Sequence, residues 1–207
     1  MTAKDSPPPE IAELADACVS YVREAMELEL DYDSDTLPIL DHYLRERGRG
    51  AEHGVYDLLI PAAGAYFGEV VRRRLGGARW HCPKGHYAAY RLEFEPFFLA
   101  FNPMGVALEV LTGAASEGWG THFQLLDDAR PVVKDALEQT DVRDEDYYTM
   151  SVRYEAVEQV ADLLSVLESQ QKKKRVFGED VYQRFRDEAG SEVGAGDGDG
   201  ASDGPPS

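Results

Sequence analysis

The chain has 207 residues, 43% of them hydrophobic, which is enough for one globular domain with a real core. Its 39 acidic residues against 21 Lys and Arg give a formal net charge of −18, which disfavours binding to the phosphates of nucleic acids. Two cysteines are too few for a disulfide scaffold, and no apolar run approaches the ~18 residues of a membrane span. Because the N-terminus also lacks the apolar core of a signal peptide, we expect a cytoplasmic protein with reduced thiols that binds neither nucleic acid nor membrane.

The N-terminal part of the chain predicts an arm followed by two helices. Residues 1–9 contain three consecutive prolines and are expected to be disordered or extended. Apolar residues between positions 11 and 26 recur at helical spacing, and Cys18 lies in that stripe as a small buried hydrophobe. A shorter helix is expected over about 35–48, with Pro38 in its first turn, where a missing N–H costs little.

Residues 54–75 predict the central helix of the fold. The segment is apolar nearly all round, as in a helix that is buried on every side. Pro61 interrupts it and predicts a kink or a restart. Gly64 and Gly68 are four residues apart and share one face, so another backbone is able to approach that face closely.

Glu69 is the polar residue of this helix that most needs an explanation. If it is exposed, Arg72 and Arg73 at i+3 and i+4 make an ordinary surface pair. If it is buried, it needs an arginine partner or a raised pKa. We favour structural pairing, and we name Glu69 and Arg73 as candidate binding residues.

The hydrophobic period then changes to that of a small antiparallel sheet. Strands are expected at 78–82, 87–94 and 97–101, with a turn at 83–86. In the middle strand Tyr90, Leu92 and Phe94 alternate with Arg91, Glu93 and Glu95, as in a strand with one solvated face.

The rest of the chain is predicted to be mostly helical. Asn102 is a good N-cap for a short helix that Gly113 ends, and a strand is possible at 122–126. Further helices are expected at 131–138 and about 152–170, and Val181, Tyr182 and Phe185 suggest a short docking helix. The predicted organisation is α+β: a disordered arm at 1–9, one domain at 10–189 with about three to four strands, and a disordered Gly/Asp-rich tail at 190–207.

The stretch "WHCPKGH" raises the question of a metal or thiol site. Cys82 and His86 have C-x3-H spacing and His81 is adjacent, so these three residues are candidate zinc ligands. A real zinc site usually presents a second pair of ligands at short spacing, and none follows here. Adjacent strand residues also point to opposite faces, which separates His81 from Cys82. The tight-turn interpretation is favoured, because Pro83 and Gly85 suit a turn.

Trp119 is a second candidate binding residue. It stands in "EGWGTHF", and the flanking glycines allow it to be exposed. An exposed tryptophan is a common contact residue in protein interfaces. The competing interpretation, a tryptophan that covers the edge of the core, is about as well supported.

The segment from Asp31 to Trp80 resembles a family of uncharacterised small bacterial proteins. The likeness rests on "DTLPILDHYL", on "GAYFGEVVRRRLGGARW" and on the later "FNPMGVALEVLTG". It implies a bacterial single-domain α+β protein in which a G-x-Y-x-G-E helix precedes a strand that begins at tryptophan. It also implies that one structural unit contains Gly64, Tyr66, Gly68, Glu69 and Trp80. It carries over no catalytic residue.

These observations favour a non-enzymatic role. The sequence lacks a nucleophile elbow, a phosphate loop, a dinucleotide fingerprint and an H-E-x-x-H motif. An acidic body suits a partner protein with a basic surface, as in an adaptor or an immunity-like protein. General solubility, or an organism whose proteins are generally acidic, explains the charge equally well. The alternative is a metal-dependent or thiol enzyme centred on Cys82 and His86.

Overall fold

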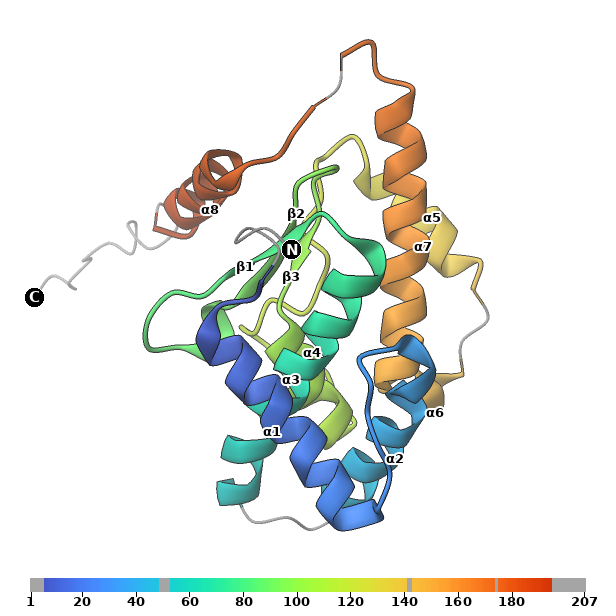
Figure 1. Cartoon of the computed structure of the whole chain (residues 1–207). Coiled ribbons are helices and arrows are strands. Elements are labelled where there is room, and N and C mark those ends of the chain that lie inside the picture. Colours follow the sequence, from blue (N-terminus) through green and yellow to red (C-terminus); the bar gives the residue numbers. More distant parts are fainter. Residues whose placement is uncertain (1–5, 49–52, 141–142, 174, 195–207) are drawn as a thin grey trace, which may run out of the picture.

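A computed structural model of the protein, which describes residues 6–48, 53–140, 143–173 and 175–194, confirms the α+β class. Helices pack around a three-stranded antiparallel sheet (Figure 1). The α-helices are α1 (Pro9–Met26), α2 (Leu37–Gly48), α3 (His53–Leu75), α4 (Pro103–Thr112), α5 (Arg130–Glu138), α6 (Asp144–Tyr147), α7 (Met150–Ser169) and α8 (Glu179–Gly194). The strands are β1 (Ala78–His81), β2 (Arg91–Phe94) and β3 (Ala100–Phe101), and the 3-10 helices are η1 (Ser34–Thr36) and η2 (Tyr87–Ala89).

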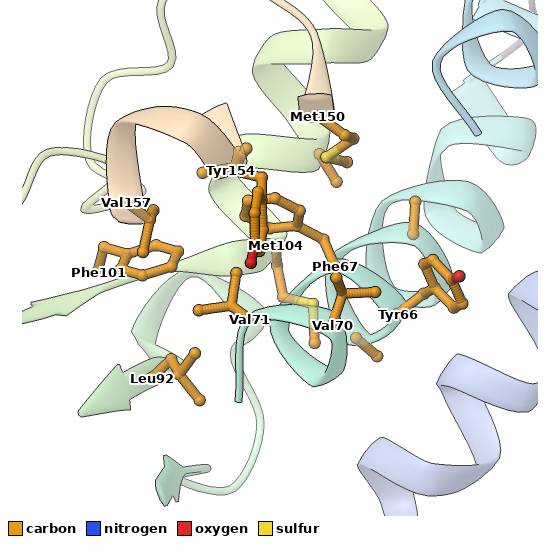
Figure 2. Packing of buried hydrophobic residues seen from close by; sticks show 14 of the residues in the cluster. Tyr66, Phe67, Val70, Val71, Leu92, Phe101, Met104, Met150, Tyr154 and Val157 are labelled. Carbon is orange, nitrogen blue, oxygen red and sulfur yellow. The ribbon is translucent and has the colours of Figure 1, made fainter. Parts of the chain in front are cut away.

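Helix α3 lies at the centre of the fold, as its all-round hydrophobicity predicts. Tyr66, Phe67, Val70 and Val71 are fully buried. Figure 2 shows these side chains of α3 packed among residues of α4, α7 and the sheet. The helix is continuous through Pro61, so it does not restart there. A helix with apolar residues on every side is stable only when neighbours cover all of those sides.

Gly64 and Gly68 bring two neighbours into direct contact with α3. A Cβ at Gly64 would lie 2.5 Å from the Cα of Met104 in α4. A Cβ at Gly68 would lie 2.3 Å from the indole ring of Trp80 in β1. Both distances are far below ordinary contact, so any larger residue would force the neighbours apart. The close approach expected from this glycine pair is confirmed, with a helix backbone at one position and an aromatic ring at the other.

The sheet is confirmed, but the connection between β1 and β2 is longer than the four-residue turn we expected. The register places Trp80 opposite Leu92 and Arg79 opposite Glu93. Residues 87–89 form η2 instead of the start of a strand, because their backbone groups are used elsewhere. The side-chain Nδ2 of Asn102 donates to the carbonyls of Tyr87 and Ala88 at 2.9 and 3.0 Å.

The third strand is also shorter than expected, since residues 97–99 do not join it. The N–H of Phe94 donates to the carbonyl of Leu99 at 3.0 Å, which makes the residues between them a chain reversal. The Tyr182 hydroxyl accepts the N–H of Leu99 at 3.1 Å and donates to the carbonyl of Phe94 at 2.7 Å. A side chain from α8 thus satisfies backbone groups at the end of the sheet. The strand expected at 122–126 is reduced to one bridge, between Ala100 and Gln124.

Helix α8 confirms the expected docking helix and covers the second face of the sheet. Its Tyr182 stacks on Phe98 with ring centroids 4.6 Å apart, and Phe98 also contacts Phe177 and Phe185. The helix continues to Gly194, which lies inside the segment predicted as a disordered tail. Residues 195–207 of that tail and residues 1–5 of the N-terminal arm lie outside the described ranges.

The other helices follow the sequence closely. Asn102 caps α4 by accepting the N–H of Met104 at 2.9 Å, and Gly113 ends it with a φ of 64°. Cys18 is 2% exposed, which confirms it as a core residue. The connection between α5 and α7 contains the short helix α6, which we did not predict from the sequence. Within the described residues, no helix is both long and apolar enough to cross a membrane.

Replacement of Gly64 by alanine tests the contact between α3 and α4. We expect Gly64→Ala to lower the free energy of unfolding by about 2 kcal/mol or more, because its methyl group overlaps the backbone of Met104. Gly54→Ala is the matched control in the same helix, since a Cβ at that position would have no neighbour within 4 Å. Chemical denaturation measures both variants, and equal stabilities would contradict the assigned contact.

Candidate functional site

Glu69 is fully buried and binds three side chains. Its carboxylate accepts two hydrogen bonds from Arg72, at 2.7 Å from Nε and 2.8 Å from Nη2. Arg73 Nε lies 3.3 Å from Oε2, and the indole N–H of Trp80 donates to Oε1 at 2.9 Å. The favoured pairing of Glu69 with both arginines is therefore present, and Trp80 adds a donor that helical spacing alone does not reveal.

The surroundings of Glu69 keep its carboxylate ionised. Burial raises the pKa, but hydrogen bonds from Arg72 and Trp80 and the charges of Arg72 and Arg73 outweigh that effect. The net pKa of Glu69 lies below its ordinary value. Glu69 itself has no exposed surface, whereas the side chain of Arg73 is 43% exposed. Of this candidate binding pair, only Arg73 is accessible.

The resemblance to small bacterial proteins implied a unit of five residues, and three of them, Gly68, Glu69 and Trp80, meet in one contact. Trp80 packs on Gly68 and binds Glu69, so β1 is joined to α3 by both packing and a hydrogen bond. Gly64 contacts α4 along the same helix. Tyr66 faces a different neighbour: its hydroxyl accepts the N–H of Tyr32 at 3.0 Å.

The segment that Tyr66 contacts is the most acidic part of the described chain. Residues 10–35, which we call the acidic surface, contain nine carboxylates and one base, Arg23. Eight of the nine carboxylates are exposed, and Asp33 is the partly buried exception. Helix α1 carries the first part of this surface, and the loop leading to α2 carries the rest (Figure 1).

Two contacts from α3 and one with α1 hold the loop of the acidic surface in place. The guanidinium of Arg73 lies 3.6 Å from the centroid of the Tyr32 ring, and Arg74 pairs with Asp33 at 3.2 Å. Tyr32 also donates from its hydroxyl to Asp16 of α1 at 2.6 Å. These contacts hold Tyr32 and Asp33 near the end of the acidic loop that leads to α2.

Leu28 is an exposed apolar residue of the acidic surface. Its exposed fraction is 43%, and the exposed residues Glu27 and Glu29 flank it. Glu27 has a φ of 56° and Tyr32 a φ of 64°, a conformation uncommon for residues other than glycine. An exposed leucine between carboxylates can contact apolar atoms of a partner while the charges bind its basic groups.

The three candidate zinc ligands lie at the end of β1 and in the long connection after it. His81 is the last residue of β1, Cys82 is half-buried and His86 is exposed. Burial, followed by the negative charge of Glu10, raises the pKa of the Cys82 thiol to about 12. A nucleophilic thiol instead needs a lowered pKa. In the ranges that the structure describes, no group of three or more His, Cys, Asp or Glu side chains is arranged to hold a metal.

Trp119 lies against the core. It is partly buried and packs on the main hydrophobic cluster, and a Cβ at Gly105 would lie 2.9 Å from the Trp119 Cβ. The flanking Gly118 and Gly120 have φ angles of 77° and 62°, which explains why glycine occupies both positions. This placement agrees with a tryptophan at the edge of the core, and a binding role for it stays a prediction.

Sequence reasoning missed three further buried acids. Glu93, expected on a solvated strand face, is fully buried and pairs with Arg79 at 2.5 Å and with Arg186 of α8. Burial raises the pKa of Glu93, and the charges of both arginines oppose that rise. The other two are Glu109 and Asp41.

The burial of Asp41 could be predicted from the sequence, whereas that of Glu109 could not. Asp41 accepts the N–H groups of Met150 and Ser151 at 2.5 and 3.1 Å and so caps α7 from α2. Its position four residues after Leu37 places it on the apolar face of α2, a signal that was available. Glu109 pairs with Arg153 at 2.8 Å, and nothing in their spacing links the two.

Comparisons with known proteins add no relative. No known family matches the chain. A search of curated proteins finds no match, and a search of solved structures finds none either. The function must therefore be inferred from the residues and their arrangement.

The first test of this region concerns the buried ion pair of Glu69. We expect Glu69→Ala to lower the free energy of unfolding by about 3 kcal/mol or more, because Arg72 and Trp80 lose their partner. The control is Glu24→Ala at an exposed position of α1, with an expected loss below about 0.5 kcal/mol. Urea denaturation measures both, and a loss at Glu69 as small as the control would contradict the buried pair.

The pH dependence of Glu69→Gln provides a second readout. Because the folded pKa is lowered, the charge of Glu69 stabilises the fold fully above the unfolded carboxyl pKa of about 4.3. That contribution is lost as the pH falls through the lower folded value. The stability difference between wild type and Glu69→Gln is therefore expected to be constant near neutral pH and to shrink on acidification below about pH 4.

Alkylation of Cys82 tests its raised pKa. We expect iodoacetamide to modify Cys82 of the folded protein at pH 7.5 roughly 100-fold more slowly than in urea-unfolded protein, because the thiolate is the reactive form. Peptide mass spectrometry distinguishes Cys82 from the buried Cys18. Equal rates in the folded and unfolded protein would revive the thiol-enzyme alternative.

Proposed function

We propose that the protein is a non-enzymatic, cytoplasmic binding protein that presents its acidic surface to a partner protein with a basic surface. The observation that carries the proposal is the concentration of nine carboxylates against one arginine in residues 10–35. An adaptor or an immunity-like protein would use such a surface. Like charges this dense repel one another, and a basic partner relieves that repulsion.

The position of Leu28 supports a specific contact over general solubility. Exposed carboxylates steer a basic partner and raise the rate of encounter, but they add little affinity individually. Residues that dominate binding energy are usually apolar or aromatic and become buried at the centre of an interface. Leu28 is 43% exposed and is surrounded by the charges that would form the polar rim of such an interface.

The order of the loop in the free protein also supports the proposal, because an ordered loop loses little conformational entropy on binding. Tyr66, Arg73 and Arg74 of α3 hold Tyr32 and Asp33 in the free protein. A surface that is already ordered loses less entropy when it binds, so more of its contact energy appears as affinity. Arg73 takes part in this arrangement by positioning the ring of Tyr32.

Affinity purification from the native host tests the proposal when it is combined with charge variants. The variant Glu24→Gln/Glu27→Gln/Glu29→Gln removes three charges around Leu28. At low salt the wild type is expected to retain a basic protein. We expect the variant to retain at least about tenfold less of that protein. Leu28→Ala is expected to weaken the same complex through loss of apolar contact.

Matched controls separate this surface from general acidity. Asp57→Asn/Asp135→Asn/Asp162→Asn removes the same charge from exposed positions elsewhere, and Leu58→Ala shortens another exposed leucine. Both controls should retain the partner as the wild type does. The proposal fails if the two charge variants bind the same proteins equally, because acidity alone would then explain the binding.

A further inference from the structure

A cleft of about 670 Å³ lies between α5 and α7. Its remaining wall comes from residues 121–125, and Tyr147 of α6 also lines it. Helix α5 lies beside α7 on the side away from α1 (Figure 1), so the cleft is separate from the acidic surface. Its volume falls within the roughly 300–1,000 Å³ typical of sites for small molecules.

The walls of the cleft are mainly apolar. Helix α5 has a strongly one-sided pattern, with Val133 and Leu137 turned toward α7, and residues 152 and 156 of α7 face them. The apolar lining residues are Phe123, Leu125, Val133, Leu137, Val152 and Ala156. A preformed apolar cleft of this size favours a ligand with an apolar body.

Arg153 supplies a charged donor to this apolar cleft. Its Nη2 donates to Glu109 at 2.8 Å, and its guanidinium lies 4.9 Å from the centroid of the Tyr147 ring. Arg153 is a lining residue of the cleft, and its side chain is 12% exposed.

Basic side chains outnumber acidic ones in the lining of the cleft, whereas acidic residues predominate in the whole chain. Acids outnumber Lys and Arg by 39 to 21 overall, whereas the cleft is lined by three cations, Arg130, Lys134 and Arg153, and two anions, Glu138 and Glu155. The pairs Arg130 with Asp127, at 3.4 Å, and Lys134 with Glu138, at 3.7 Å, are exposed. Exposed pairs of this kind are weak, so Lys134 is able to turn toward a ligand. Arg130 also donates from Nε to the carbonyl of Leu125 at 3.3 Å.

The geometry points to a binding site for a small molecule with an apolar body and a carboxylate group. The apolar body packs between α5 and α7, and the carboxylate accepts hydrogen bonds from the guanidinium of Arg153. Arginine and a carboxylate form paired, charge-assisted hydrogen bonds, which favour this head group over a neutral one. The site is independent of the proposed partner protein, because it uses another face of the molecule.

NMR titration of the full chain with sodium decanoate tests the inference. We expect shifts of the methyl signals of Val133, Leu137 and Ala156, with half-saturation below about 1 mM. Decan-1-ol has the same apolar body without the charge, and we expect it to bind about tenfold more weakly. Decylammonium should bind still more weakly, because its charge is repelled by Arg153.

Three variants locate the site. Ala156→Phe fills the cleft and should weaken decanoate binding at least about tenfold, whereas Val166→Phe, on an exposed part of α7 outside the lining, should not. The double variant Glu109→Gln/Arg153→Met removes both charges of the buried pair together, so neither remains unpaired. It should bind decanoate and decan-1-ol equally.

Each contrary result overturns the inference by itself. Absence of methyl shifts up to about 5 mM decanoate would mean that the cleft takes no such ligand. Equal binding of decanoate and decan-1-ol by the wild type would remove the role of Arg153. Unchanged binding by Ala156→Phe would place the ligand elsewhere, and thermal unfolding of this variant confirms that it is folded.

Discussion

The rest of the structure depends on the close contact that α3 makes with its neighbours at Gly64 and Gly68. Without a side chain at these positions, Met104 of α4 and the ring of Trp80 rest directly on the helix backbone. The second contact brings the Trp80 indole within hydrogen-bonding distance of Glu69, one residue after Gly68. One face of one helix therefore sets the position of both the sheet and the buried ion pair.

The acidity of the chain is divided between two kinds of carboxylate. Buried acids each have specific partners: Glu69, Glu93 and Glu109 pair with arginines, and Asp41 caps α7. Such groups stay buried only because those partners offset the loss of hydration. The exposed acids of the acidic surface have few partners, and Arg74 and Arg23 are the bases that pair there in the described chain. Only this second kind is available to another molecule.

The cleft between α5 and α7 and the acidic surface lie on different sides of α7 (Figure 1). Helices α2, α3 and α4 contact α7, whereas α5 touches it from the other side. The molecule therefore offers a charged surface and an apolar cleft, and each suits a different class of ligand. The same helix that packs the core with Tyr154 and Val157 presents Arg153 and Ala156 to the cleft.

Local signals in the sequence determined the helices, the α+β class, the turn glycines and the cap at Asn102, because helical period and capping act over a few residues. They also indicated that Glu69 pairs with Arg72 and Arg73, since helix geometry places those residues side by side. Only the tertiary structure decided that Tyr87–Ala89 leaves the sheet, that Glu93 is buried beneath α8, and that Glu109 meets Arg153. These outcomes depend on residues that are distant in the chain, such as Asn102, Arg186 and Tyr182, and no local period reports which distant segment will cover a given face.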